Sequence, residues 1–363
     1  MSLLALDSIL HDCWQTLSVG LSILILVAEG LWLSTGRAVY LTHARYWSRL
    51  LAIDIAIALG SSIPMAFELC GRDAGVARSV CMLRGIEPGA GCAIAALLQL
   101  GFLGIMLYGW NRLSRGAHLL ATGMVAINST LAAFWSIAAD AAARSPHVAN
   151  HIDMGQSMML YAKVIFGMGM ERSIPYLWLD AIANSLVVIG GVSAWKMLRR
   201  EQRVLFGRSF RSAAALLLVI AAVHALVTKS SEMAILSTGP LRIANGVNAW
   251  LLVLAVWTAS STMHPYRRLG RRLAERRLLL AWVVAMPLPF VGTACTWFAR
   301  MTESVPGLPG RSEIGLIHAR AGSGLDAAFQ AILVVIFLWS TSRWFSGGAE
   351  AAMTPARRQT PAR

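Results

Sequence analysis

Long apolar segments alternate with short polar connections along almost the whole chain. Nine such segments are present, at residues 14–33, 50–69, 92–110, 119–141, 176–197, 213–227, 243–263, 278–299 and 327–345. About 20 mostly apolar residues form a helix long enough to cross the roughly 30 Å core of a bilayer. Lipid offers no partner to unpaired backbone groups, and the segments show no strand-like alternation. The pattern therefore predicts an all-α integral membrane protein, folded as a bundle of nine transmembrane helices.

Basic residues are distributed unevenly among the connections. About two thirds of the 32 Lys and Arg residues lie in, or directly beside, the connections after the first, third, fifth and seventh segments and the C-terminal tail. The positive-inside rule places these connections in the cytoplasm, with the N-terminus outside and the C-terminus inside. The net charge of +14 is spread over turns that flank the membrane. It therefore does not indicate nucleic-acid binding.

The apolar pattern predicts one membrane domain at residues 1–345 and a short polar tail at 346–363. Residues 1–13 contain no Lys or Arg, so they lack the charged start of a secretory signal and suggest a lead-in at the outer surface. The tail is rich in small and polar residues and contains Pro355 and Pro361, a composition typical of disorder.

Cysteine positions leave one question open. Cys70 and Cys81 share a predicted outer connection, where an oxidising compartment permits a disulfide but does not require one. No CxxC pair or Cys/His cluster with metal-ligand spacing is present, so the sequence does not indicate a zinc site.

An ordered series of residues resembles a known membrane family over nearly the whole chain. The series comprises His11, Gly20-Leu21, Ala28-Glu29-Gly30-Leu31-Trp32, Tyr46-Trp47-Ser48-Arg49-Leu50, Glu68, Tyr108-Gly109-Trp110-Asn111-Arg112, His118, Ser193-Ala194-Trp195-Lys196 and Pro287-Leu288-Pro289-Phe290. Together these resemble subunit I of the cytochrome bd quinol oxidases. The resemblance implies nine membrane helices with an outside N-terminus, in the bacterial cytoplasmic (inner) membrane.

The resemblance also implies a chemistry: electron transfer from quinol to oxygen through hemes of the b and d types, in a complex with a second membrane subunit. A heme iron needs an axial nitrogen, sulfur or oxygen donor. His11 matches the family's first-helix heme-ligand histidine, and it is the one candidate ligand that is retained. The other positions that match family ligands carry different residues, namely Gly91, Gln99, Tyr176, Asn248 and Ala294.

The family's long quinol-binding connection between the sixth and seventh helices is also missing, because only residues 228–240 join those segments here. The resemblance thus does not extend to quinol binding. We expect at most one heme, and two hypotheses for function remain. The first is an electron-transfer subunit of the bd type with reduced heme binding. The second is a heme-poor relative that acts as a membrane scaffold, assembly partner or sensor.

Four ionisable residues within the apolar segments are further candidates, because charge at bilayer depth costs a few kcal/mol. They are Glu29, Glu68, Asp180 and His224. They are interpreted either as the lining of a cofactor cavity or proton route, or as polar contacts that hold helices together. A structural role is favoured for Glu29.

Overall fold

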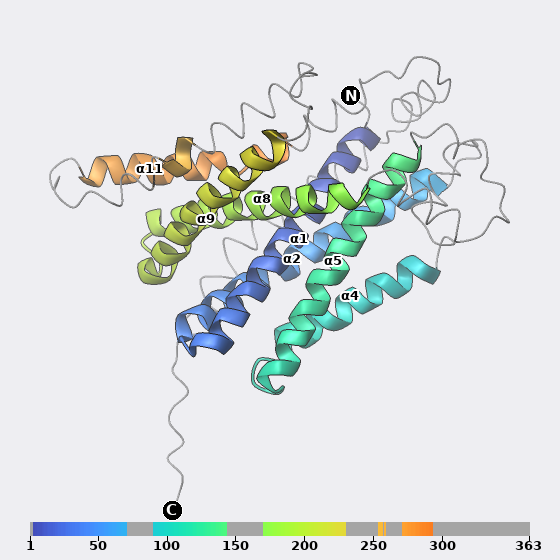
Figure 1. Ribbon diagram of the computed structural model, residues 1–363, viewed down its shortest axis with the longest axis horizontal. Helices are drawn as coiled ribbons and strands as arrows, with labels where there is room; N and C mark the ends of the chain where they lie inside the picture. Colours follow the sequence, from blue (N-terminus) through green and yellow to red (C-terminus); the bar gives the residue numbers. More distant parts are fainter. Residues whose placement is uncertain are drawn as a thin grey trace, which may run out of the picture.

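All regular elements that the structure describes are α-helices (Figure 1). The computed structural model describes residues 3–70, 90–143, 170–229, 253–256, 258 and 271–292. Its helices are α1 (Leu3–Thr35), α2 (Ala38–Cys70), α4 (Ala90–Tyr108), α5 (Arg115–Ala143), α8 (Met170–Leu198), α9 (Arg203–Lys229) and α11 (Arg271–Ala285). The prediction of an all-α protein is confirmed.

Four helices among the described residues are long and apolar enough to cross a membrane. These stretches are His11–Thr35, Arg115–Phe134, Leu177–Leu198 and Val204–Val223. They overlap the first, fourth, fifth and sixth apolar segments predicted above. The count of nine helices and the orientation of the two termini stay predictions. The segment 327–345, the tail 346–363 and Cys81 lie outside the described residues.

Three helices begin ten or more residues before the apolar segments predicted for them. Helix α2 begins at Ala38, twelve residues before the predicted segment at 50. The lead-in at residues 3–13 is continuous with the first segment in α1. Helix α9 begins at Arg203, ten residues before the predicted segment at 213. Its first turns bury Phe206 and Phe210 in the core while Arg208 and Arg211 stay exposed. The uninterrupted apolar run starts only after Arg211, so the run alone places the start of this helix too late, because its first turns are amphipathic.

Helix α1 is the centre of the bundle and packs against α2, α5 and α8 (Figure 1). Helices α1 and α8 approach closely at Gly20, where an added Cβ atom would lie 2.0 Å from the Ala181 carbonyl oxygen of α8. Polar contacts also link α1 to its neighbours. The Ser18 hydroxyl donates to Asp54 of α2 at 2.6 Å, and the Ser185 hydroxyl of α8 donates to the Leu17 carbonyl at 3.3 Å. Small residues and interhelical hydrogen bonds are the usual means of close packing in membranes.

Helix α8 packs on its other side against α9 and α11. Gly190 of α8 leaves the space that the buried Trp282 ring of α11 occupies, since an added Cβ atom would lie 2.2 Å from that ring. The Trp282 indole donates to the Thr258 hydroxyl at 2.8 Å, which satisfies its one polar group. In the last turn of α8, the ammonium of the fully buried Lys196 donates at 2.6 Å to Glu201, which lies in the connection to α9.

Candidate functional site

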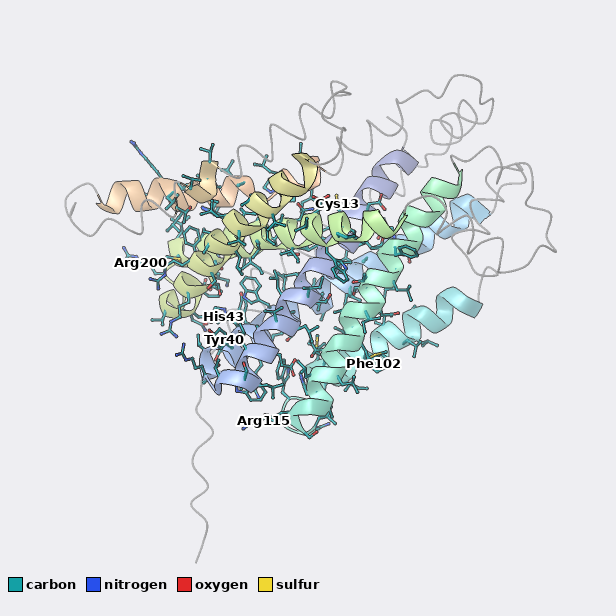
Figure 2. The ribbon with its side chains drawn as sticks, viewed as in Figure 1. Cys13, Tyr40, His43, Phe102, Arg115 and Arg200 are labelled. Carbon is teal, nitrogen blue, oxygen red and sulfur yellow. The ribbon has the colours of Figure 1, made fainter. Side chains whose placement is uncertain are left out.

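His11 lies on α1 near one end of the bundle, close to Cys13, which Figure 2 shows at the opposite end from Tyr40, His43 and Arg115. Its imidazole is buried, and its Nδ1 lies 3.0 Å from the Ser61 hydroxyl of α2. Ser61 in turn donates its only hydroxyl hydrogen to the Ala58 carbonyl at 2.9 Å. The Ser61 oxygen must therefore accept from His11, so Nδ1 holds the ring proton. The resulting tautomer has its lone pair on Nε2, as a metal-binding histidine requires.

Gln99 of α4 is bound at both ends of its amide by α5. Its nitrogen donates to the Ser129 hydroxyl at 3.0 Å, and its oxygen accepts from the Asn128 amide at 2.7 Å. All three side chains are buried or half-buried. The amide therefore serves as a link between α4 and α5. The other third-helix position, Gly91, has no side chain to offer a ligand.

A second buried polar group joins α1 to α5 at the other end of the bundle. The Oε1 atom of Glu29 lies 2.5 Å from Nδ1 of His118, and its Oε2 accepts from the Thr122 hydroxyl at 2.7 Å. Nε2 of His118 donates to the Met106 carbonyl at 2.9 Å. The Trp110 ring lies against the imidazole with a centroid separation of 3.9 Å. We refer to Glu29, His118 and Thr122 as the buried triad.

The buried triad does not share a site with His11. The two α1 residues, His11 and Glu29, are 18 positions apart, which is about 27 Å along a helix axis. Both ring nitrogens of His118 are engaged by protein atoms, so this imidazole has a structural role. Sequence reasoning foresaw a structural role for Glu29 but did not identify His118 as its partner.

The remaining candidates are not brought together with His11 by the part of the chain that is described. The carboxylate of Asp180 is exposed on α8. Glu68, Tyr176 and His224 belong to α2, α8 and α9, and their side chains lie outside the described part, as do Asn248 and Ala294 altogether. No group of three or more His, Cys, Asp or Glu side chains able to hold a metal ion occurs among the described residues. The roles of these residues stay predictions.

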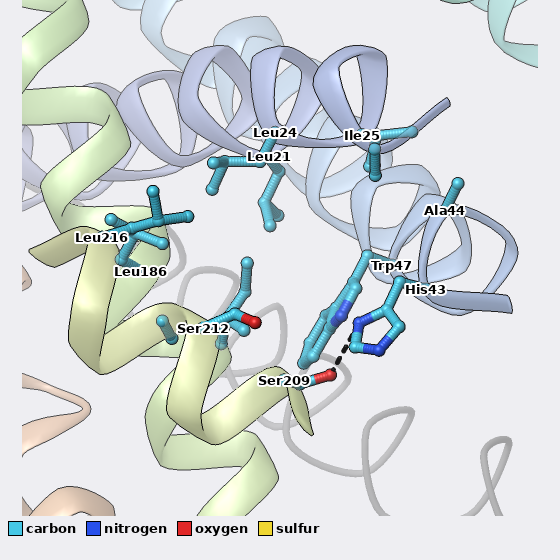
Figure 3. A pocket seen from close by; sticks show the side chains of 13 residues that line it. Leu21, Leu24, Ile25, His43, Ala44, Trp47, Leu186, Ser209, Ser212 and Leu216 are labelled. Carbon is cyan, nitrogen blue, oxygen red and sulfur yellow. Dashed lines mark hydrogen bonds between the residues drawn. The ribbon is translucent and has the colours of Figure 1, made fainter. Parts of the chain in front are cut away.

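A cavity of about 100 Å³ lies between α1, α2, α8 and α9 (Figure 3). Most of its lining is apolar, and His43 and Ser209 form a hydrogen bond of 3.0 Å at its edge. Of the α1 residues that line the cavity, Leu21 is nearest to His11 in the sequence. The two residues are ten positions apart, which is about 15 Å along the helix axis. Pockets for cofactor-sized ligands are usually about 300–1,000 Å³. This cavity is therefore a separate feature and too small for a porphyrin.

His43 gives the protein a predicted pH dependence. The side chain lies on the first turns of α2, outside the four apolar stretches named above. Burial, reinforced by the positive charge of Arg208, lowers the pKa of His43 from 6.5 to about 4. Between these values the unfolded chain binds a proton that the folded chain does not. Stability is therefore fully present above pH 6.5 and decreases as the pH falls toward 4, by at most about 1.4 kcal/mol per pH unit from this group.

Unfolding titrations at several pH values between 7 and 4 will check this expectation. His43→Gln keeps a hydrogen-bonding side chain but cannot titrate, so the slope should be shallower in the variant than in the parent. Identical slopes in the two proteins would show that His43 titrates normally in the folded state.

The described part of the chain is helical, and four of its helices are apolar and long enough to span a membrane, as in a membrane protein. The family model of cytochrome bd terminal oxidase subunit I matches residues 2–250, well over half of the chain. The chain therefore belongs to this family, as the series of residues in the sequence predicted.

Individual relatives agree with this assignment. The chain is 26% identical over 209 residues to cytochrome bd-II ubiquinol oxidase subunit 1 of Escherichia coli (strain K12), covering 57% of this chain and 40% of that protein. It is 24% identical over 262 residues to cytochrome bd ubiquinol oxidase subunit 1 of Bacillus subtilis (strain 168), covering 71% and 56% respectively. The chain thus spans only about half the length of these curated relatives. The solved structure of bd oxidase from Geobacillus thermodenitrificans has a similar fold, with a TM-score of 0.68 at 15% identity over 95% of this chain and 96% of that one.

Proposed function

We propose that this protein is a divergent bd-oxidase subunit of the bacterial cytoplasmic membrane that binds at most one heme, through His11. It acts in electron transfer together with a second membrane subunit and does not oxidise quinol alone. Its nine helices form one domain over residues 1–345, with the N-terminus outside and the C-terminal tail in the cytoplasm. Family membership supports the general role, and the relatives named above are ubiquinol oxidase subunits.

The geometry around His11 is the observation on which the heme proposal rests. The chain from the Ala58 carbonyl through Ser61 to Nδ1 fixes the tautomer of the imidazole and its ring orientation. Outer hydrogen bonds of this kind orient metal-binding histidines and raise the basicity of the ligating nitrogen. A bound heme supplies a one-electron redox centre. The residues present thus fit one axial ligand of such a group.

The environment of Gln99 supports the restriction to one heme. An amide is a poor substitute for a carboxylate ligand, and both of its ends are already bound to α5. Gly91 provides no donor at all. Of the remaining positions that match family ligands, Asn248 is a poor iron ligand and Ala294 has no donor atom, which leaves the Tyr176 phenol as the one side chain among these three suited to bind iron.

The second candidate function, a heme-poor scaffold or assembly partner, draws on the same polar contacts. The Gln99 link and the buried triad both connect helices without presenting a reactive group. A protein retained only for its shape would keep such links and lose His11 without consequence.

The pyridine-hemochrome spectrum of the purified, detergent-solubilised protein will distinguish the two functions. We expect no more than one heme per chain in the parent and none in His11→Ala. Ser61→Ala should weaken heme affinity by about 10–100-fold, because the tautomer and ring orientation are no longer fixed. His43→Gln is the matched control at the other end of the bundle and should keep the parental heme content.

Three outcomes would contradict the proposal. A parent protein without heme above trace would support the scaffold function instead. Heme that persists in His11→Ala would place the ligand elsewhere. Quinol oxidation by the purified chain alone at enzyme-like rates would show that a complete catalytic set is present.

A further inference from the structure

The cavity between α1, α2, α8 and α9 is a slot whose walls come from all four helices. Helices α2 and α9 meet at few positions, among them the His43–Ser209 hydrogen bond and the contact of the Tyr46 and Phe206 rings. Along α1 the lining runs from Leu21 to Ala28, which corresponds to about 10 Å of helix rise. Figure 3 shows the side chains of Leu21, Leu24, Leu186 and Leu216 around one part of this space, with His43 and Ser209 at the other.

The size and lining of the slot define what it can hold. A dry apolar cavity of about 150 Å³ in another protein binds benzene or xenon. A volume of about 100 Å³ spread over this length accepts a narrow aliphatic chain but not a ring system. The lining is apolar along α1 and α8, at Leu21, Ile25 and Leu186, whereas the polar groups His43, Ser209 and Ser212 come from the first turns of α2 and α9. The slot is therefore apolar on one side and polar on the side of these two helix starts.

Positive charge lies at this polar end. Arg208 directly precedes Ser209 in α9, its guanidinium is exposed, and its charge acts on His43. Arg45 and Arg49 of α2 are close enough to each other to interact. Two carboxyl groups among the described residues lie toward this end, and both have partners: Glu201 is bound to Lys196, and Glu29 to His118 and Thr122. The charge of Arg208 thus remains available to an anion.

We propose that the slot between α2 and α9 binds one acyl chain of an anionic phospholipid, with the lipid phosphate against Arg208. A basic group at the mouth of an apolar site between membrane helices suits an anionic lipid headgroup. The proposal rests on the membrane topology proposed above, which places Arg208 beside the cytoplasmic leaflet, where anionic lipids are abundant. It explains why an arginine and an apolar slot adjoin at a position with no part in heme binding.

Native mass spectrometry will test this after reconstitution in nanodiscs of equal parts phosphatidylcholine and phosphatidylglycerol. We expect one phosphatidylglycerol molecule to remain on the parent protein after release into detergent. Arg208→Gln should reduce the preference for phosphatidylglycerol over phosphatidylcholine by about fivefold, which is the effect of one arginine near a lipid headgroup. Ser212→Leu extends a branched side chain into the slot and should abolish retention of both lipids.

Two control variants match these changes away from the slot. Arg112→Gln removes an exposed charge in the turn between α4 and α5, and Ala132→Leu adds the same kind of bulk to the exposed face of α5. Both should retain lipid like the parent. The proposal is overturned if the parent retains no lipid or shows no preference for phosphatidylglycerol. It is also overturned if Arg208→Gln behaves like Arg112→Gln, or Ser212→Leu like Ala132→Leu. A nanodisc presents the same lipids on both faces, so a wrong orientation or a failed heme assay does not affect this result.

Discussion

Replacing Glu29 with alanine is expected to destabilise the protein by about 3–5 kcal/mol, because it breaks a fully buried contact between α1 and α5 from one side. The Glu29 carboxyl group is 0% exposed, shares a hydrogen bond with Nδ1 of His118 and accepts from the Thr122 hydroxyl, both on α5. Alanine would leave the Nδ1 atom of His118 and the Thr122 hydroxyl without this partner in a low-dielectric interior. Unfolding in sodium dodecyl sulfate, followed by circular dichroism, will measure the change.

The exposed carboxylate of Asp180 offers a matched control. Asp180→Ala removes the same charge from the surface of α8 and should cost at most about 1 kcal/mol, as is usual for exposed charges. The double variant Glu29→Ala, His118→Ala should be less destabilised than the sum of its single variants, because it removes the imidazole whose Nδ1 atom Glu29→Ala alone deprives of its partner. Additive effects would show that the two side chains do not stabilise each other.

The sequence predicted the elements of this fold better than the contacts among them. The length of the apolar segments was enough to predict α1, α5 and α8, because a membrane-spanning helix can be recognised from its composition. It misplaced the start of α9, where Phe206 and Phe210 are interleaved with exposed arginines. The phenylalanines of this stretch are recognised as buried only when the helices that pack against them are known.

The polar contacts show the same limit at the level of side chains. Glu29 was recognised as a structural residue, but its partner His118 is 89 positions away in the chain. Helical periodicity tells which face a residue occupies and not which helix lies opposite. The same holds for His11 and Ser61, which are 50 positions apart. The sequence indicates only the approximate depth of each polar residue in the membrane. Many pairs of polar residues share the same depth, so depth does not identify the partner.

The positions at which this sequence lacks the heme ligands of the family were identified by aligning its residues with the family pattern. For Gln99, the structure adds that its amide is bound on both sides by α5, a fact that no single sequence provides. Tyr176, Asn248 and Ala294 stay predictions. What the described structure contributes is therefore a partner for each side chain: Ser61 of α2 for His11, and Asn128 and Ser129 of α5 for Gln99.

Gly20→Ala is expected to be among the most damaging small substitutions in the chain. The added Cβ atom would lie 2.0 Å from the Ala181 carbonyl oxygen and 2.3 Å from the Ser185 hydroxyl of α8. The first of these atoms belongs to the backbone of a packed helix, so relief requires α1 and α8 to separate. Overpacking a well-filled interior usually costs about 1–3 kcal/mol, and we expect at least about 3 kcal/mol here because the whole helix pair must move.

Gly30→Ala, made on the same helix, separates this steric effect from helix propensity. An added Cβ atom at Gly30 meets no heavy atom within 4 Å, so the methyl group has room. Alanine is favoured over glycine in a helix interior by about 0.8–1 kcal/mol, and Gly30→Ala should therefore stabilise the protein slightly. Unfolding titrations of the two variants should shift in opposite directions. Equal shifts would mean that α1 and α8 do not approach each other at Gly20, and the central position of α1 in the bundle would then be wrong.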